Sequence, residues 1–182
     1  DAHATQWASP YGLVGLLAAG NVLAEQGPEK PLLTIPGEKE VAHYWARAGF
    51  FRHAAECFEI HGKPPRVRPA AESDVLLEVT LIKGADDVHG VVGRIQERAA
   101  HILQGELKLE AQATMGFAMA LSEACQNIVE HAGTSGWGAV QAYNWRRKLG
   151  RRVGVSAVAD AGVGFRHSLE PTQARRFGDR WN

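Results

Sequence analysis

Three polar side chains recur at intervals of four residues within one stretch of this 182-residue chain: Glu123, Asn127 and His131. Because an α-helix has about 3.6 residues per turn, this spacing places a carboxylate, a carboxamide and an imidazole along one helix face. A carboxylate can act as a general base, and a carboxamide oxygen is a hard ligand that suits Mg²⁺. A solvated polar face has the same spacing, so this pattern alone leaves both interpretations open.

A second polar motif, Asp160-Ala-Gly162-Val-Gly164, follows a run of small and β-branched residues. An aspartate at the end of a strand can accept a hydrogen bond from an amine on a ligand. Glycine lacks a side chain, so it lets a ligand approach the backbone closely. An ordinary glycine-rich turn would have the same composition, and this motif alone is therefore weak.

Together, and in this order, the two motifs resemble those of the Bergerat-fold ATPases, the superfamily of gyrase, heat-shock chaperones, histidine kinases and mismatch-repair ATPases. Glu123-Ala-Cys-Gln-Asn127-Ile-Val-Glu-His131-Ala132 resembles the N-box, and Asp160-Ala-Gly162-Val-Gly164-Phe165 resembles the G1 box. The closing His-Ala is most similar to the anti-sigma-factor serine/threonine kinases. The resemblance covers about Val75–Phe165.

The resemblance implies a role for each motif residue. Asn127 would coordinate Mg²⁺, which bridges the ATP phosphates, and Glu123 would be the general base that activates a hydroxyl. Asp160 would bind the adenine amino group. The implied cofactors are thus ATP and Mg²⁺, and the implied acceptor is a regulatory protein partner, either a STAS-type antagonist or a sigma factor.

Three further motif residues have supporting roles in this interpretation. Gly162 and Gly164 would pass close to the adenine base. His131 would cap the helix or contact the residues that bind the nucleotide. The family is often dimeric, so a homodimer is possible, although the sequence contains no recognisable dimer seam.

One family feature has no match in this sequence. Nothing after Gly164 fits the second glycine-rich box, whose backbone N–H groups wrap the phosphates. We therefore expect a piece of a longer protein that stops before this box. This piece would be inactive alone, whereas its parent would be an ATP-dependent protein kinase. The alternative is a non-enzymatic Bergerat-like interaction module that has lost ATP turnover.

Hydrophobic periodicity and breaker residues predict an α/β chain with two parts. In the first part we expect helices and short strands at Tyr11–Gln26, Leu32–Ile35, Glu38–Ala48 and Phe58–Ile60. In the second part we expect a β-α-α-β-β order at Val75–Ile82, Asp86–Gln104, Glu110–His131, Val140–Trp145 and Arg152–Ala159. The resemblance makes this second part a two-layer Bergerat-type α/β sandwich.

The proline-rich stretch between these parts predicts a linker at 63–74. It separates a small domain at 1–62 from the ATPase-like domain at 75–182. Residues 8–51 faintly resemble STAS domains, because Ser9-Pro10-Tyr11-Gly12-Leu13 opens a helix and a short strand follows. STAS-type antagonists carry a phosphorylated serine where this chain has Tyr11, and a generic α/β packing domain is the equal alternative.

Composition excludes several classes of protein. A net charge of +0 and a 45% hydrophobic content indicate a globular chain and not a basic nucleic-acid binder. The longest apolar run, near Gly12–Ala24, is too short to span a membrane. Cys57 and Cys125 predict two buried thiols and a cytoplasmic location. Five cations at Arg146–Arg152 predict a solvated hairpin tip rather than an anion site.

Overall fold

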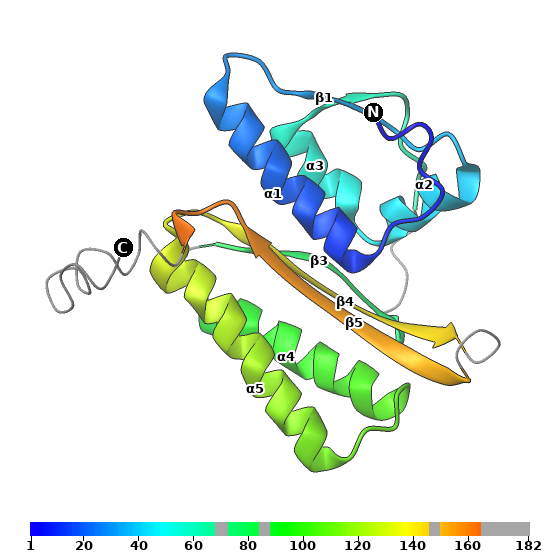
Figure 1. Cartoon of the computed structure of the whole chain (residues 1–182), viewed down its shortest axis with the longest axis vertical. Helices are drawn as coiled ribbons and strands as arrows, with labels where there is room; N and C mark the ends of the chain where they lie inside the picture. Colours follow the sequence, from blue (N-terminus) through cyan, green and yellow to red (C-terminus); the bar gives the residue numbers. More distant parts are fainter. Residues whose placement is uncertain (68–72, 84–87, 146–149, 165–182) are drawn as a thin grey trace, which may run out of the picture.

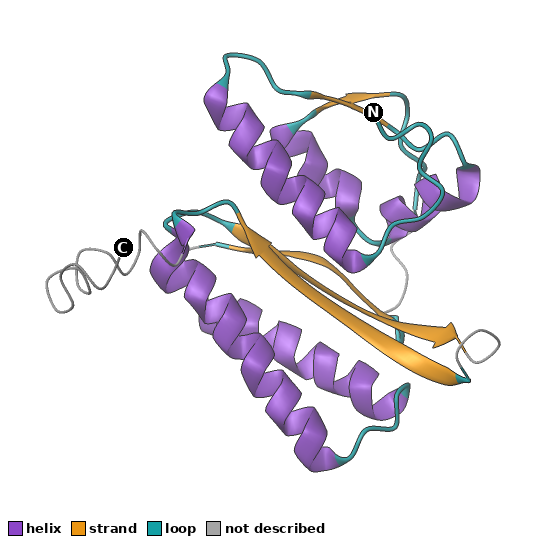
Figure 2. Ribbon diagram, in the orientation of Figure 1, coloured by secondary structure: helices purple, strands orange, loops and turns teal. Residues whose placement is uncertain are grey.

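The computed structural model describes residues 1–67, 73–83, 88–145 and 150–164, and it confirms the predicted mixed α/β class (Figure 2). The N-terminal unit, residues 1–62, begins with helix α1 (Pro10–Gln26). The Ser9 hydroxyl caps α1 by accepting a hydrogen bond from the Gly12 N–H at 3.3 Å. Proline is tolerated in the first helical turn, where its missing N–H would have no partner. Strand β1 (Leu32–Thr34) pairs in parallel with β2 (Glu59–His61).

Two short helices connect these strands, where only one was expected. Helix α2 (Lys39–Arg47) ends before Gly49, whose φ of 74° breaks the helical path, and α3 (Phe50–Cys57) starts at the next residue. The prediction assigned no helix to 50–57. Eight residues span about two turns, which is too short for periodicity to stand out. Phe50 and Phe51 are buried, and their rings pack edge to face at 5.5 Å.

The second part of the chain has the predicted β-α-α-β-β order. It consists of β3 (Leu76–Ile82), α4 (Val88–Gly105), α5 (Ala111–Asn127), β4 (Gly136–Trp145) and β5 (Arg151–Asp160). The strands form an antiparallel sheet in the order β3-β4-β5. The basic cluster lies only partly within the described residues, because 146–149 are outside them.

Different parts of the chain cover the two faces of this sheet (Figure 1). Helices α4 and α5 pack on one face, with a core that includes Ile82, Ile95, Ile102 and Val140. The N-terminal unit packs on the other face, chiefly through α1, and its core extends into the sheet at Val79, Trp137 and Ala157. The first five residues of β4 are therefore all buried, which is typical of a strand covered on both faces.

Main-chain hydrogen bonds also join the N-terminal unit to the sheet. Strand β3 contains a register irregularity between Leu77 and Thr80. At this bulge the Val79 N–H donates to the Ala48 carbonyl at 2.8 Å, and the His53 ring nitrogen lies 3.0 Å from the Val79 carbonyl. The two predicted domains thus share the hydrophobic core on one face of the sheet and are joined by these hydrogen bonds at Val79. The division at 63–74 itself stays a prediction, since residues 68–72 lie outside the described part.

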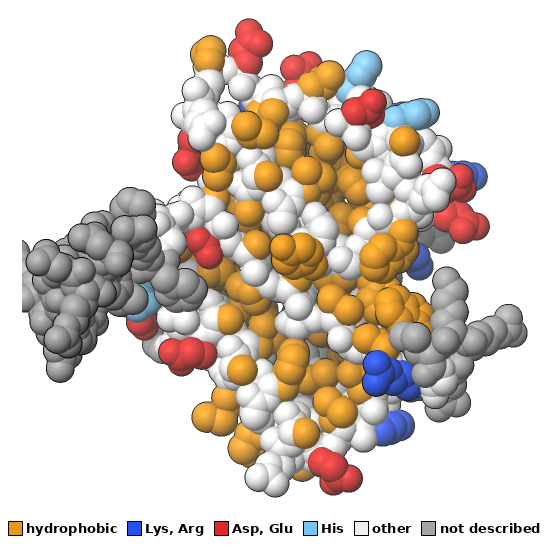
Figure 3. All heavy atoms as spheres, in the orientation of Figure 1, with side chains coloured by type: hydrophobic (Ala, Val, Ile, Leu, Met, Phe, Trp, Pro, Cys, Tyr) orange, Lys and Arg blue, Asp and Glu red, His pale blue; other side chains and the backbone are white. Residues whose placement is uncertain are grey.

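Hydrophobic and positively charged side chains occupy different parts of the molecular surface. On the face in Figure 3, hydrophobic side chains extend across the junction between the N-terminal unit and the sheet, and cations gather beside the β4–β5 hairpin end. Cys57 and Cys125 are buried free thiols, as predicted. Within the described ranges, no helix is long and apolar enough to cross a membrane.

Candidate functional site

The helix that carries the first motif does not end as an uninterrupted α-helix. We predicted one helix over Glu110–His131, but α5 stops at Asn127 and Ile128–Ala132 form a single π-helical turn. Gly133, with a φ of 68°, ends that turn. A π turn is wider than an α turn, and such turns are frequent at functional sites. It places Asn127 at the last α-helical position and His131 inside the wider turn.

The sheet lies very close to this turn because β4 begins with glycine. A Cβ atom at Gly136 would lie 2.6 Å from the Ile128 Cδ1 atom and 2.7 Å from the Ala159 carbonyl oxygen. Gly136 also pairs with Asp160, the last residue of β5. The missing side chain at 136 therefore lets the π turn pack against the strand end that carries Asp160.

The Asp160–Gly164 loop is bonded directly to the π turn. The Asp160 Oδ1 atom accepts a hydrogen bond from the Gly162 N–H at 2.8 Å, and the Val163 N–H donates to the Ala132 carbonyl at 3.1 Å. A Cβ atom at Gly162 would lie 2.1 Å from that same Ala132 oxygen. Only glycine fits there, so Gly162 supports the contact between the two motifs.

A cavity of about 240 Å³ lies between the two motifs. Four of the six predicted site residues line it: Asn127, His131, Asp160 and Gly164. Ala124, Ile128, Ala132 and Val158 complete its wall with apolar surface. The spacing of polar residues gave no signal for these apolar positions. Ala124, Ile128 and Ala132 each follow a motif residue by one position, so they lie on the adjacent face of the predicted helix.

The other two predicted site residues do not line this cavity. Glu123 is exposed on α5, one turn before Asn127. Gly162 packs against the backbone of Ala132 and not toward the cavity. The predicted catalytic role of Glu123 therefore has no supporting contact in the described residues.

The polar groups of the cavity keep free hydrogen-bonding capacity. The second carboxylate oxygen of Asp160 has no partner among the described residues, so it can accept a hydrogen bond from a ligand amine. The His131 Nε2 atom lies 3.8 Å from the Glu130 carboxylate, and both side chains are about half exposed. Burial raises the pKa of the adjacent Cys125 thiol to about 11, so this thiol stays protonated and is no nucleophile at neutral pH.

The cavity residues offer oxygen ligands for Mg²⁺ and a hydrogen-bond acceptor for a nucleotide base. Among the described residues, no group of three or more His, Cys, Asp or Glu side chains could hold a metal ion. Mg²⁺ does not need such a cage, since it usually binds one or two protein oxygens together with phosphates and water. The Asn127 carboxamide fits that requirement, and the free Asp160 oxygen fits an adenine amino group.

No protein-family model, no curated protein sequence and no solved structure matches this chain, so the assignment of the site depends on its own residues and geometry.

Proposed function

We propose that this chain is a nucleotide-binding regulatory protein of the Bergerat type, similar to the anti-sigma-factor serine/threonine kinases. One observation carries the proposal: Asn127 and His131 line the same cavity as Asp160 and Gly164, although the two motifs are about 30 residues apart. An incidental solvated helix face and an ordinary turn would have no reason to share a cavity.

In this proposal three of the cavity residues have a defined task. The Asn127 carboxamide oxygen holds Mg²⁺, which supplies charge neutralisation for the phosphates when bound. Asp160 accepts a hydrogen bond from the adenine amino group. Gly164 has a φ of 71°, and no atom of the other described residues lies within 4 Å of where its Cβ would be, so no described side chain covers the cavity there.

The size of the cavity supports an adenine site more than a complete nucleotide site. Its volume of about 240 Å³ is below the range of about 300–1,000 Å³ that is usual for drug-sized ligands. The residues of this cavity would hold the adenine base, and Asn127, which also lines it, would hold the metal ion that neutralises the phosphates. No second glycine-rich motif follows Gly164 in the sequence.

The proposal includes the finer fold assignment. Residues 75–164 are a Bergerat-type sandwich of sheet and helices, and residues 1–62 are a STAS-like unit that packs on its outer face. The partner is a regulatory protein, a STAS-type antagonist or a sigma factor, in the cytoplasm. Phosphate transfer to a partner hydroxyl would require Glu123 as the base, and a homodimer is the proposed assembly.

A non-enzymatic interaction module is the second candidate. The observation that favours it is the position of Glu123, which is exposed and outside the cavity lining. A general base must come within hydrogen-bond reach of the hydroxyl that it activates. A module of this kind would not require nucleotide binding, and Glu123 would have no catalytic role in it.

Calorimetric titration of ADP into this chain, with Mg²⁺ or with EDTA, tests the proposal. We expect tighter binding with Mg²⁺ and loss of that difference in Asn127→Ala, because the metal ligand is removed. Asn21→Ala on α1 is the matched control, since its side chain bonds Glu25 and lies outside the cavity. Absence of ADP binding, or an Asn127→Ala variant that keeps the Mg²⁺ dependence, would overturn the site assignment.

Glu123→Ala separates the two candidates. If the parent protein is a kinase, this substitution in the parent keeps ADP binding and abolishes phosphate transfer, as measured with radiolabelled ATP. Transfer at the wild-type rate would exclude Glu123 as the base.

A further inference from the structure

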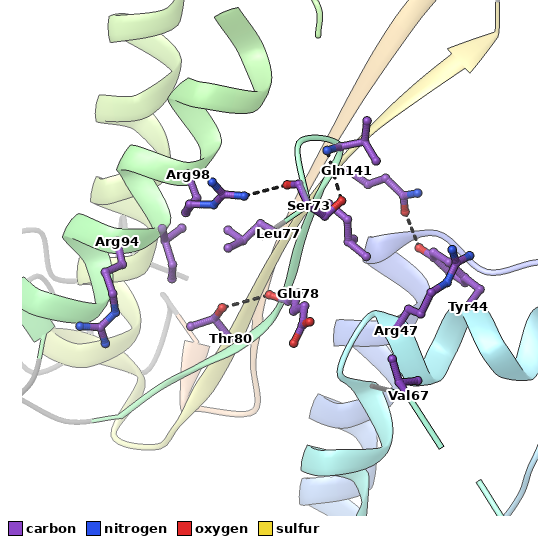
Figure 4. Close-up of a pocket in the computed structure, with 13 residues that line it drawn as sticks. Tyr44, Arg47, Val67, Ser73, Leu77, Glu78, Thr80, Arg94, Arg98 and Gln141 are labelled. Carbon is purple, nitrogen blue, oxygen red and sulfur yellow. Dashed lines mark hydrogen bonds between the residues drawn. The ribbon is translucent and has the colours of Figure 1, made fainter. Parts of the chain in front are cut away.

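A cavity of about 700 Å³ lies at the free edge of β3, and none of the motif residues lines it (Figure 4). We call it the β3 edge groove. Tyr44 and Arg47 of α2 form one wall, and Arg94 and Arg98 of α4 form the other. Strand β3 runs between these walls, so residues of both the N-terminal unit and the sheet line the groove.

Part of the main chain in this groove lacks a partner. In an antiparallel pair, successive residues of an edge strand point their N–H and C=O groups alternately toward the neighbouring strand and away from it. The Ala142 N–H donates to the Val75 carbonyl at 2.8 Å, so the main chain of Leu76 points outward into the groove. Farther along the edge, Val79 is already bonded to Ala48 and His53, whereas Leu76 has no such bond within the described residues.

The charges around this free edge are mainly positive. Among the described residues that line the groove, three are arginines and one, Glu78, is a carboxylate, which is paired with Arg52 at 2.7 Å. The Arg98 guanidinium donates to the Ser73 carbonyl at 2.7 Å. Neither Arg47 nor Arg94 forms an ion pair within the described ranges. Both guanidiniums can therefore bind a carboxylate of a ligand in the two-bond geometry that arginine favours.

We propose that the β3 edge groove binds an extended acidic segment of a partner protein. The segment adds a short strand beside Leu76, and its carboxylates bind Arg47 and Arg94. Strand addition takes its affinity from main-chain hydrogen bonds and its selectivity from alternate side chains. Val75 and Leu77 provide apolar surface for the side chains that flank the acidic ones.

This inference is independent of the nucleotide site, because the two cavities share no residue. The probe is a fluorescein-labelled peptide in which pairs of adjacent glutamates alternate with pairs of valines, so that carboxylates point to both faces of the added strand. Fluorescence anisotropy measures its affinity. The same peptide with lysines in place of the glutamates is the charge control. We expect only the glutamate peptide to bind.

Matched variants test the contribution of the arginines. Arg47→Glu and Arg94→Glu should each weaken binding of the glutamate peptide by about tenfold or more, because each replaces a cation with a repelling anion. Arg151→Glu makes the same change of net charge at an exposed position of β5 and should leave the affinity unchanged. Equal losses in all three variants would indicate nonspecific charge attraction and overturn the proposal.

The strand addition has its own measurement. Hydrogen exchange of the Leu76 amide should slow when the glutamate peptide binds, and methylation of alternate peptide nitrogens should abolish binding. Unchanged exchange at Leu76, or full competition by free glutamate at equal concentration, would contradict the strand addition. Magnesium-dependent ADP binding should be the same in Arg47→Glu as in the unmodified chain, so a failure here is distinct from a failure of the nucleotide site.

Discussion

The two faces of the β3–β4–β5 sheet differ in what their covering elements contribute. Helices α4 and α5 cover one face, and α5 carries Asn127 to the cavity at the end of the sheet. The N-terminal unit covers the other face through a core that includes Trp45, Phe50 and Trp137, and none of its residues lines that cavity. The comparison shows that one face supplies the candidate chemistry and the other supplies packing for the same three strands.

The largest expected effects come from truncating one buried side chain on each face. Phe50 and Ile95 are at most 1% exposed. Phe50→Ala should lower the free energy of unfolding by about 3–5 kcal/mol and Ile95→Ala by about 2–5 kcal/mol, because each leaves a cavity. Urea unfolding followed by circular dichroism and tryptophan fluorescence measures both.

The number of unfolding transitions tests whether the elements on the two faces of the sheet unfold together. Because both cores include residues of the sheet, we expect one transition that shifts in both variants. Leu23→Ala on α1 is the control, since Leu23 is 51% exposed and its truncation should change stability by about 0.5 kcal/mol or less. Two separate transitions, each sensitive to only one variant, would mean that the N-terminal unit and the sheet unfold independently.

A smaller effect is expected from Gly162→Ala, at the contact between the motifs. The new Cβ would lie 2.1 Å from the Ala132 carbonyl oxygen, so the backbone must shift. We expect a loss of about 1–3 kcal/mol in unfolding free energy, the usual cost of overpacking. Thermal and urea unfolding provide the measurement.

Gly116→Ala on α5 is the matched control for that substitution. Nothing lies within 4 Å of a Cβ at Gly116, which is within the helix. Alanine there should raise the free energy of unfolding by about 0.5–1 kcal/mol through its better helix propensity. An increase in unfolding free energy in both variants would indicate that Gly162 does not pack against the π turn.

The smallest effect concerns His53, where the N-terminal unit meets β3. Burial lowers the pKa of His53, with Arg52 and Lys83 acting in the same direction, and the hydrogen bond to Val79 and the Glu56 charge oppose this. The unfolded chain therefore binds a proton more readily than the folded one. The stabilisation is fully present above the unfolded pKa of about 6.5 and decreases as the pH falls through the lower folded pKa.

His53→Gln tests this dependence while keeping a side-chain donor for the Val79 carbonyl. Unfolding free energies at pH 7.5 and pH 5 should differ less in the variant than in the unmodified chain. The same pH dependence in both proteins would place its origin at other titrating groups.

Local sequence signals predicted most of the second part of the chain. The β-α-α-β-β order followed from hydrophobic periodicity and from breakers such as Gly133, because these signals depend only on neighbouring residues. Helix α3 was missed, and β4 begins at Gly136 rather than at the predicted Val140. Glycine is a poor strand former, and only the neighbouring strands and the Ile128 side chain account for strand structure at Gly136 and Gly138.

The candidate site also depends partly on local sequence patterns and partly on tertiary contacts. By itself, the sequence determined which chemical groups are available and in what order, since the spacing of Glu123, Asn127 and His131 and the glycines after Asp160 are local patterns. The tertiary structure decided which of them meet. The π turn at Ile128–Ala132 and the close contact of Gly162 with Ala132 place four of these residues around one cavity and leave Glu123 outside it. Such contacts depend on packing between segments distant in sequence, and no pattern within one segment contains that information.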